Sequence, residues 1–390
     1  MLKLSKRVTT IKESKTLAIN TKAKGIAATG EKVYNFAVGE PDINPPAILI
    51  KEIEKAFNKG FTKYTPPSGL PEAKEKIAKH LGTQMAFSFT KDNIALSCGG
   101  KHSLYNVFQA IIGTNDEVII PRPYWVSYPE QITLSGGKPI FVNSTKDLQL
   151  DVKAIANSIT RRTKAIVLNS PNNPTGVVFK KEVLTQLAKL LEKKDIFIIS
   201  DDVYQTLVYT KKPYHIAHYS KNIREKTIIV DSYSKSLAMT GLRLGIVAAS
   251  KEIVSAIDKL QGQTCGNPTS IIQMGVANTL GRVKTYQKEY LALFTKRRKI
   301  VLALLEKNSL ISYPTPDGGF YVFINIKKIS NDSFDFCEKL LKKHHVALVP
   351  GKAFGQEGFV RISFASNVTD LKEGIKRFNT FCKEESKIIY

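Results

Sequence analysis

The chain has 390 residues, of which 43% are hydrophobic and 24% are charged. This is enough apolar material for one large domain with a second, smaller domain, and it excludes a small disulfide scaffold. Its formal net charge of +24 comes from lysines spread in short groups along the sequence, a pattern typical of solvated helix faces, so we expect no nucleic-acid partner. The four cysteines form no C-x-x-C pair, and no apolar run or secretion signal points to a membrane, so we expect a cytoplasmic protein without a metal site.

The chain begins with weak periodicity and then alternates helical and strand patterns. The first 44 residues could pack on any part of the molecule. From residue 45 onward, amphipathic helical patterns are followed by short runs rich in Val, Ile and Leu, which predict βαβ units and a mostly parallel sheet. The predicted helices cover residues 46–60 and 71–81, and the predicted strands cover 94–97, 117–121, 164–170, 195–201 and 227–232.

The pattern changes after about residue 283. A long helical stretch follows, and then strands and helices alternate over shorter distances, which predicts a smaller α+β domain. The predicted helices cover residues 284–307, 334–344 and 369–382, and the predicted strands cover 318–326, 346–350 and 358–365.

A lysine follows the last strand of the predicted parallel sheet. Lys235 stands among small polar residues in DSYSKSLAMTGLRLG (231–245), with Arg243 eight positions later. Ligands of such sheets bind at the carboxyl ends of the strands, where a lysine can attack a carbonyl group and form a Schiff base. For this segment alone, the alternative is a surface lysine in a Ser-rich loop.

Two other strand ends carry polar side chains. Asp201 and Asp202 follow the run DIFIIS, and Tyr204 comes two residues later. A buried Asp201 needs a cationic partner such as a protonated ring nitrogen, whereas the alternative is a solvent-facing acidic pair. Asn173 lies in the turn-rich segment NSPNNPTG after another strand, where its amide could donate to a ligand oxygen.

The segment SCGGKHSL (97–104) joins the strand at 94–97 to a helical pattern. The glycines Gly99 and Gly100 would let backbone N–H groups approach a phosphate at the helix N-terminus. A Walker A loop is excluded, because Ala95 and His102 stand where that motif needs Gly and Ser or Thr.

These four segments resemble the fold-type I pyridoxal-phosphate-dependent aminotransferases of class I. Within them, the chain is similar to bacterial aspartate aminotransferases of the subgroup that uses a lysine for the acidic side chain. AVGEPD, KYTPPSG, PYWVSYPE, GGFYV, VPG and RISFA also stand in the expected order, so the similarity covers nearly the whole chain. It implies an α/β fold with a large domain, whose mostly parallel sheet is flanked by helices, and a smaller α+β domain.

The resemblance also implies how the chain is divided. Residues 45–283 would form the large coenzyme-binding domain, and residues 284–390 the small C-terminal domain. Residues 1–44 would pack with the small domain and cover the site.

The resemblance implies catalytic roles for three side chains around pyridoxal 5'-phosphate. Lys235 would hold the coenzyme as a Schiff base and move the substrate α-proton. Asp201 would keep the pyridine nitrogen protonated, and Tyr204, together with Asn173, would hydrogen-bond the phenolic oxygen of the ring.

Further residues would bind the coenzyme phosphate and ring by the same resemblance. Trp125 matches an aromatic residue stacked on the ring and bordering the substrate. Tyr64 resembles a tyrosine that reaches the phosphate of the other subunit, which implies a homodimer with shared active sites. The phosphate would contact Gly100, Lys101, Ser232 and Arg243.

The substrate-binding residues follow from the same match. Arg361 would clamp the α-carboxylate through two hydrogen bonds, joined by Asn173 and the backbone at Gly39. Lys101 resembles the lysine that binds an acidic side chain. The predicted reaction is ping-pong transfer of an amino group between an L-amino acid, aspartate or glutamate, and a 2-oxo acid such as 2-oxoglutarate.

Three alternatives stay open at this point. The chain could act as an aromatic or prephenate aminotransferase. His102, Asp202 and Leu242 replace residues that are common at the edge of the site, which leaves the preferred amino acid and this activity open. It could be a β-lyase of the same fold and coenzyme that acts on a sulfur amino acid. It could also be a basic binding protein that kept the fold without the activity.

Overall fold

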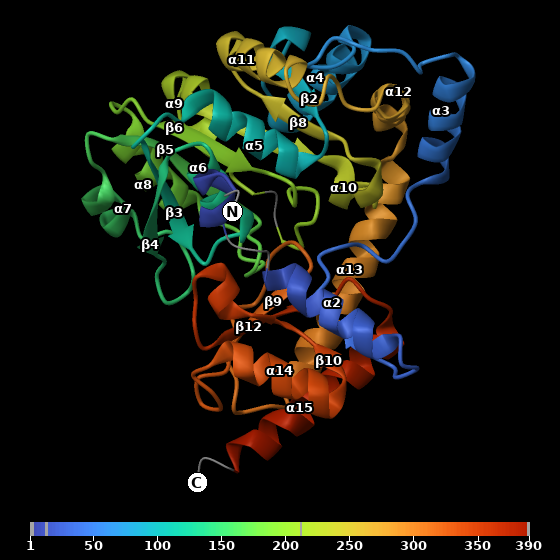
Figure 1. Cartoon of the computed structure of the whole chain (residues 1–390), viewed down its shortest axis with the longest axis vertical. Helices are drawn as coiled ribbons and strands as arrows, with labels where there is room; N and C mark the ends of the chain where they lie inside the picture. The colour runs from blue at the N-terminus through green and yellow to red at the C-terminus, as the bar shows by residue number, and fades with distance from the viewer. Residues whose placement is uncertain (1–3, 12–14, 211–212, 388–390) are drawn as a thin grey trace.

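A seven-stranded sheet forms the centre of the larger part of the molecule in the computed structural model, which describes residues 4–11, 15–210 and 213–387 (Figure 1). The strand order is β2-β8-β7-β6-β5-β3-β4, and every neighbouring pair is parallel except the two that involve β8. The α/β fold with a mostly parallel sheet is therefore confirmed. The strands are β2 (Ile94–Ser97), β3 (Glu117–Arg122), β4 (Lys138–Asn143), β5 (Thr163–Asn169), β6 (Phe197–Asp201), β7 (Thr227–Ser232) and β8 (Gly245–Ala248).

Helices cover both faces of this sheet because its central strands bury both faces. Ile166 and Leu168 of β5 pack with α7, α8 and α9, whereas Ala165 and Val167 point to the other face and pack with α5, α6 and α11. The helices α3, α4 and α12 cover β2 and β8. Their bounds are α3 (Ala47–Asn58), α4 (Pro71–Met85), α5 (Gly100–Ile111), α6 (Ser127–Leu134), α7 (Val152–Ser158), α8 (Lys181–Leu191), α9 (Lys221–Lys226), α11 (Lys251–Gly262) and α12 (Ser270–Thr279).

Two strands of the sheet were not predicted from the sequence. The edge strand β4 has the sequence KPIFVN and is only partly buried, so it lacks a continuous apolar run. The strand β8 is fully buried, but only the short helices α10 (Tyr233–Ser236) and η3 (Thr240–Leu242) lie between it and β7, so it does not continue the alternation of strands and longer helices.

A smaller part of the molecule lies below the large sheet in Figure 1 and is reached through the long helix α13 (Lys284–Leu305). The predicted division at residues 283 and 284 falls where this helix begins. A three-stranded antiparallel sheet, of order β11-β12-β9, packs there with two helices. These elements are β9 (Tyr321–Asn325), α14 (Ser333–His344), β11 (Val349–Pro350), β12 (Phe359–Ser363) and α15 (Val368–Ser386).

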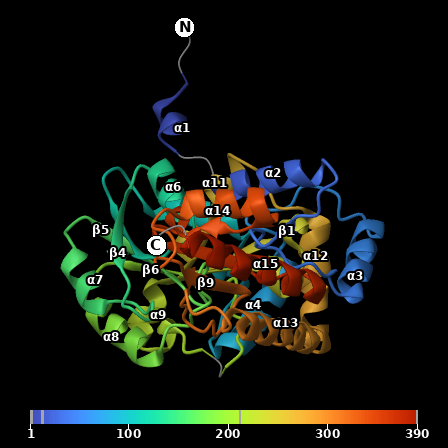
Figure 2. The same ribbon diagram turned by 90° about the horizontal axis from the view of Figure 1, so that it is seen from below.

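The N-terminal segment lies against this smaller part. The short strand β1 (Tyr34–Asn35) pairs in parallel with β10 (Val346–Ala347), and α2 (Lys15–Ala27) lies beside β10 and β11. The predicted strand over 346–350 is thus two short strands in different sheets. In Figure 2 the first helix, α1 (Lys6–Thr10), stands out from the body of the molecule.

The strand register brings the predicted polar residues to one edge of the large sheet. Asn169 at the end of β5 is paired with Asp201 at the end of β6. Gly245, the first residue of the reversed strand β8, lies between Ser97 and Ser232. The loops that carry the predicted lysine, carboxylate and glycines therefore leave the sheet side by side. No helix among the described residues is long and apolar enough to cross a bilayer.

Candidate active site

A cavity of about 400 Å³ opens at this edge of the large sheet, and the smaller part of the molecule contributes to its wall. Eleven of the twelve residues predicted for the site line it. The exception is Tyr64, whose side chain is 97% exposed. The eleven are Gly39, Gly100, Lys101, Trp125, Asn173, Asp201, Tyr204, Ser232, Lys235, Arg243 and Arg361.

Lys235 lies in the cavity on the short helix α10 (Tyr233–Ser236), which follows β7 directly. Its Nζ donates a hydrogen bond of 2.6 Å to the carbonyl oxygen of Gly39, and its own backbone carbonyl accepts one from the hydroxyl of Tyr290. Burial lowers the pKa of Lys235 to about 8, with Glu40 opposing the shift. A substantial fraction of this amine is therefore neutral, and nucleophilic, at mildly alkaline pH.

This lowered pKa predicts an unusual reactivity for Lys235. In protein freed of bound ligand, acylation of its amine is expected to rise with a midpoint near pH 8, because only the neutral amine reacts. Ordinary lysines have midpoints near pH 10.4. Peptide mass spectrometry after brief treatment with acetic anhydride at a series of pH values gives the midpoint for each lysine. An ordinary midpoint at Lys235 would contradict the prediction.

Asp201 is the buried anion of the cavity. Its side chain is 6% exposed and its Oδ2 accepts a hydrogen bond from the hydroxyl of Tyr128, while its Oδ1 accepts one from the backbone N–H of Val203. Burial raises the pKa of Asp201 to about 6. No lysine, arginine or histidine among the described residues forms a salt bridge with it, so the carboxylate is suited to a cationic group of a ligand.

The neighbouring Asp202 has a different environment. Its carboxylate lies 3.1 Å from the Nε2 of His215 and accepts a hydrogen bond of 2.6 Å from the hydroxyl of Ser200. All three side chains are buried. The solvent-facing acidic pair considered above is therefore wrong, and His215 is a hydrogen-bonded core histidine.

An anion cradle is formed where β2 meets α5. The first hydrogen bonds of the helix run from the N–H groups of His102 and Ser103 to the carbonyl of Gly99, so the amides of Gly100 and Lys101 stay at the open helix end. Gly99 has a φ of 92°, a conformation that favours glycine, and a Cβ there would clash with the Arg243 guanidinium. A glycine is thus required for Arg243 to reach this helix end.

Arg361 supplies a buried cation to the cavity from the smaller part of the molecule. It lies on β12 and is 3% exposed. Its Nη1 donates to Asn173 Oδ1 at 2.9 Å, and its Nη2 donates to the carbonyl of Ala37 at 2.7 Å, while its Nε has no hydrogen-bond partner. No described carboxylate forms an ion pair with this guanidinium. An anionic ligand would satisfy it.

Two tyrosines connect these groups. The hydroxyls of Tyr204 and Tyr321 lie 2.8 Å apart, and the guanidinium of Arg361 lies 4.4 Å from the centre of the Tyr321 ring. Burial raises the pKa of both hydroxyls, so both stay protonated and can donate.

Several residues of the site were not predicted from the sequence. Tyr128 holds Asp201, Tyr321 packs under Arg361, and Asn20 and Glu40 line the cavity. Tyr321 stands in an apolar strand pattern, which predicts only burial. Tyr128 meets its partner across 73 residues of sequence, a distance at which spacing carries no signal.

The comparisons with known proteins agree with this geometry. Residues 31–378 match the family described as aminotransferase class I and II. The chain is 39% identical to an aspartate aminotransferase of Bacillus subtilis over 99% of this chain and 100% of that one. It is 38% identical to a probable aspartate/prephenate aminotransferase of Aquifex aeolicus over 98% and 99%. A solved aspartate aminotransferase of Thermus thermophilus with maleate superposes with a TM-score of 0.94, at 34% identity over 98% of this chain and 100% of that one.

Proposed function

The chain belongs to the class I and II aminotransferases, and we propose that it moves the amino group of aspartate or glutamate to a 2-oxo acid such as 2-oxoglutarate. The observation that carries the proposal is the cavity itself. It combines an amine of lowered pKa at Lys235 with a buried guanidinium, Arg361, that has no carboxylate partner among the described residues.

The cavity fits pyridoxal 5'-phosphate as the coenzyme. The anion cradle of Arg243 and the α5 N-terminus suits its phosphate, the Asp201 carboxylate suits a protonated pyridine nitrogen, and Lys235 suits its carbonyl carbon. The other cavity residues that would bind the coenzyme are Gly100, Lys101, Trp125, Asn173, Tyr204 and Ser232. When bound, pyridoxal 5'-phosphate supplies a carbonyl that exchanges amino groups and a ring that accepts the electron pair of the substrate Cα–H bond.

The protein residues supply orientation and proton transfer. The two Nη groups of Arg361, together with Asn173, would bind the α-carboxylate and so hold the Cα–H bond in one direction. The amine of Lys235 would take the α-proton of the amino acid in one half-reaction. In the other half-reaction it would return a proton to the α-carbon of the oxo-acid substrate. The Asp201 carboxylate would hold the positive charge of a protonated ring nitrogen. Transfer in two half-reactions gives ping-pong kinetics.

An acidic substrate is supported by Lys101. Its side chain lines the cavity, and its Nζ lies 5.3 Å from the centre of the Trp125 ring. We propose that Lys101 binds the side-chain carboxylate, as in the lysine-using subgroup. Prephenate is the second candidate acceptor, because the relative from Aquifex aeolicus is named a probable aspartate/prephenate aminotransferase.

We also propose that the active unit is a cytoplasmic homodimer with shared sites. Tyr64 is almost fully exposed, and the next residue, Thr65, donates its N–H to Asn267 of the loop between α11 and α12. A large aromatic side chain held on a fixed loop but left in solvent suits contact with a second subunit.

The absorbance spectrum of the purified protein tests this function. A visible coenzyme band is expected to disappear when aspartate is added alone and to return when 2-oxoglutarate is added, since each substrate completes one half-reaction. Absence of the band after adding pyridoxal 5'-phosphate would contradict the coenzyme. Return of the band with prephenate in place of 2-oxoglutarate would support prephenate as the acceptor. A response to aromatic amino acids but not to aspartate would favour the aromatic alternative, and release of pyruvate and ammonia from a sulfur amino acid would favour a β-lyase.

A further inference from the structure

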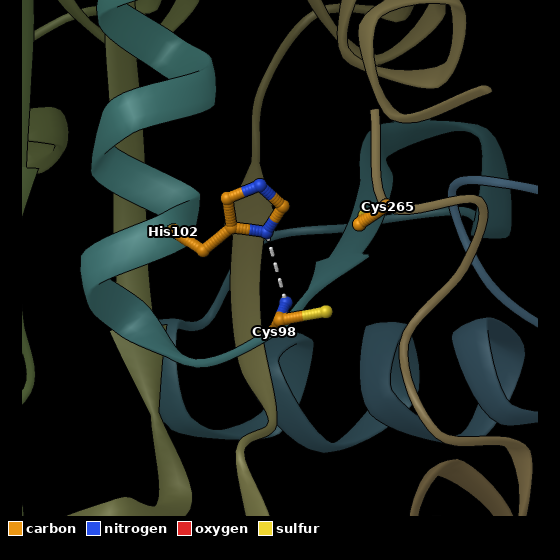
Figure 3. Close-up of side chains that lie close together, drawn as sticks. All are labelled: Cys98, His102 and Cys265. Carbon is orange, nitrogen blue, oxygen red and sulfur yellow. Dashed lines mark hydrogen bonds between the residues drawn. The ribbon is translucent and has the colours of Figure 1, made fainter. Parts of the chain in front are cut away.

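Three potential metal ligands converge beside the anion cradle although they are distant in the sequence. Figure 3 shows Cys98, at the end of β2, next to His102 in the first turn of α5, with Cys265 approaching from the loop between α11 and α12. Their ligand atoms all lie within 4.8 Å of one another. Cys98 and His102 are partly buried and Cys265 is exposed, and all three cysteine and histidine side chains lie outside the set that lines the catalytic cavity.

A buried glutamine fixes the position of the Cys265 loop. Gln261 donates to the carbonyl of Leu96 at 2.9 Å, and its Oε1 accepts a hydrogen bond of 3.0 Å from Asn106 of α5. The carbonyl of Gln261 in turn accepts the N–H of Gly266 at 2.8 Å. The loop that carries Cys265 is therefore attached to the same strand and helix that carry the other two groups.

The imidazole is also held in place. Its Nδ1 accepts the backbone N–H of Cys98 at 3.2 Å, so the ring and the cysteine that precedes it by four residues form one unit. This hydrogen bond uses the lone pair of Nδ1, so a cation that binds this nitrogen would replace the Cys98 N–H at the ring.

We propose that Cys98, His102 and Cys265 bind a thiophilic divalent cation of the zinc class, with a fourth position open to water. Two thiols lose their protons to solvent and bind as thiolates, and the imidazole binds through a ring nitrogen. Zinc–ligand distances of about 2.0–2.3 Å in a tetrahedron require ligand atoms about 3.5–3.8 Å apart. The ligand atoms lie within 4.8 Å of one another, so they would have to approach by up to about 1 Å to reach this spacing.

The charges nearby select the type of cation. Arg243 donates to the carbonyl of Cys98 at 3.3 Å, so an added net positive charge would be repelled. A divalent ion bound by two thiolates is neutral, whereas Mg²⁺ or Ca²⁺ has no carboxylate ligand here among the described residues. The expectation that the chain has no metal site rested on sequence spacing alone, and we revise it for this cluster.

The test uses full-length reduced protein, treated with a chelator and titrated with Cd²⁺ as a spectroscopic probe for Zn²⁺. We expect ultraviolet thiolate-to-metal absorbance that saturates at one ion per chain and is reversed by Zn²⁺. Cys98→Ser and Cys265→Ser should remove it, and His102→Gln should weaken binding at least about 10-fold. His80→Gln, at a partly buried histidine hydrogen-bonded within α4, is the matched control and should bind normally.

A second measurement covers variants that fail to fold. In the wild-type protein, Zn²⁺ should protect Cys98 and Cys265 from alkylation, with the buried Cys337 and Cys382 as internal references. Saturation that is unchanged in the three variants, or absence of both absorbance and protection, would overturn the proposal. It would also be overturned if oxidised glutathione joined the two thiols in a disulfide while Zn²⁺ showed no affinity. Neither readout depends on aminotransferase activity, so the proposed function is tested separately.

Discussion

Replacement of Lys235 by alanine is expected to lower turnover by about 10⁴-fold, the largest effect of any single substitution in this protein, since the variant has no amine at the position that must carry the proton. The fold should persist, because the side chain contributes one hydrogen bond, to Gly39, and its ammonium form is disfavoured by burial. Stopped-flow measurement of each half-reaction with aspartate and with 2-oxoglutarate gives the change directly.

A matched control separates this effect from a general loss of lysine charge. Lys251→Ala removes an exposed amine that pairs with Asp92 on the surface, and it should leave turnover unchanged. Partial recovery of the Lys235→Ala rate by added methylamine would support proton transfer as the missing function. Turnover within about 10-fold of the wild type would contradict the assignment of Lys235.

Asp201→Asn is expected to lower turnover by about 10²- to 10³-fold, the second-largest effect, while making the coenzyme-free protein more stable. The amide is similar in size to the carboxyl and can still accept the hydroxyl of Tyr128, but it cannot hold a protonated ring nitrogen in place by charge. Activity should fall in kcat more than in KM, because the charge acts on the transition state.

The stability of the same variant should depend on pH. The folded protein holds the Asp201 proton up to about pH 6, whereas the unfolded chain releases it near the ordinary value of 3.8. Between these values the folded state binds more protons, so the stability of the wild type falls as pH rises and stays lowered above pH 6. The difference between the two pKa values of Asp201, in the folded and the unfolded chain, corresponds to a loss of about 3 kcal/mol in the free energy of unfolding. In urea unfolding, the advantage of Asp201→Asn should therefore grow from pH 5 to pH 8, and a constant difference would contradict the burial cost.

The sequence predicted the positions that local chemistry determines. Continuous Val, Ile and Leu runs identified β3, β5, β6 and β7 because strands buried on both faces must be apolar throughout. Lys235 and Asp201 were predicted as site residues for a related reason, since polar residues at the ends of such strands lie at the edge where ligands bind.

Contacts made across long stretches of sequence could not be predicted in this way. Tyr128 and Tyr321 resemble ordinary core residues by pattern, and only the folded chain brings them to Asp201 and Arg361. The same is true of Cys98 and Cys265, whose approach depends on the packing of α11 against α5. Spacing rules describe ligands within one loop or helix, so they give no signal for groups that different elements bring together.

The pairing of β1 with β10 determines when the cavity can form during synthesis of the chain. The strands of the large sheet lie between residues 94 and 248 and can pair as soon as they leave the ribosome. The segment next to Gly39 must wait, because Ala37 is bound by Arg361, which is 324 residues further along the chain. The nascent protein is therefore expected to complete its scaffold first and its substrate-binding wall last, so a chain truncated before β10 would hold the coenzyme-facing loops without Arg361, the guanidinium that would clamp a carboxylate.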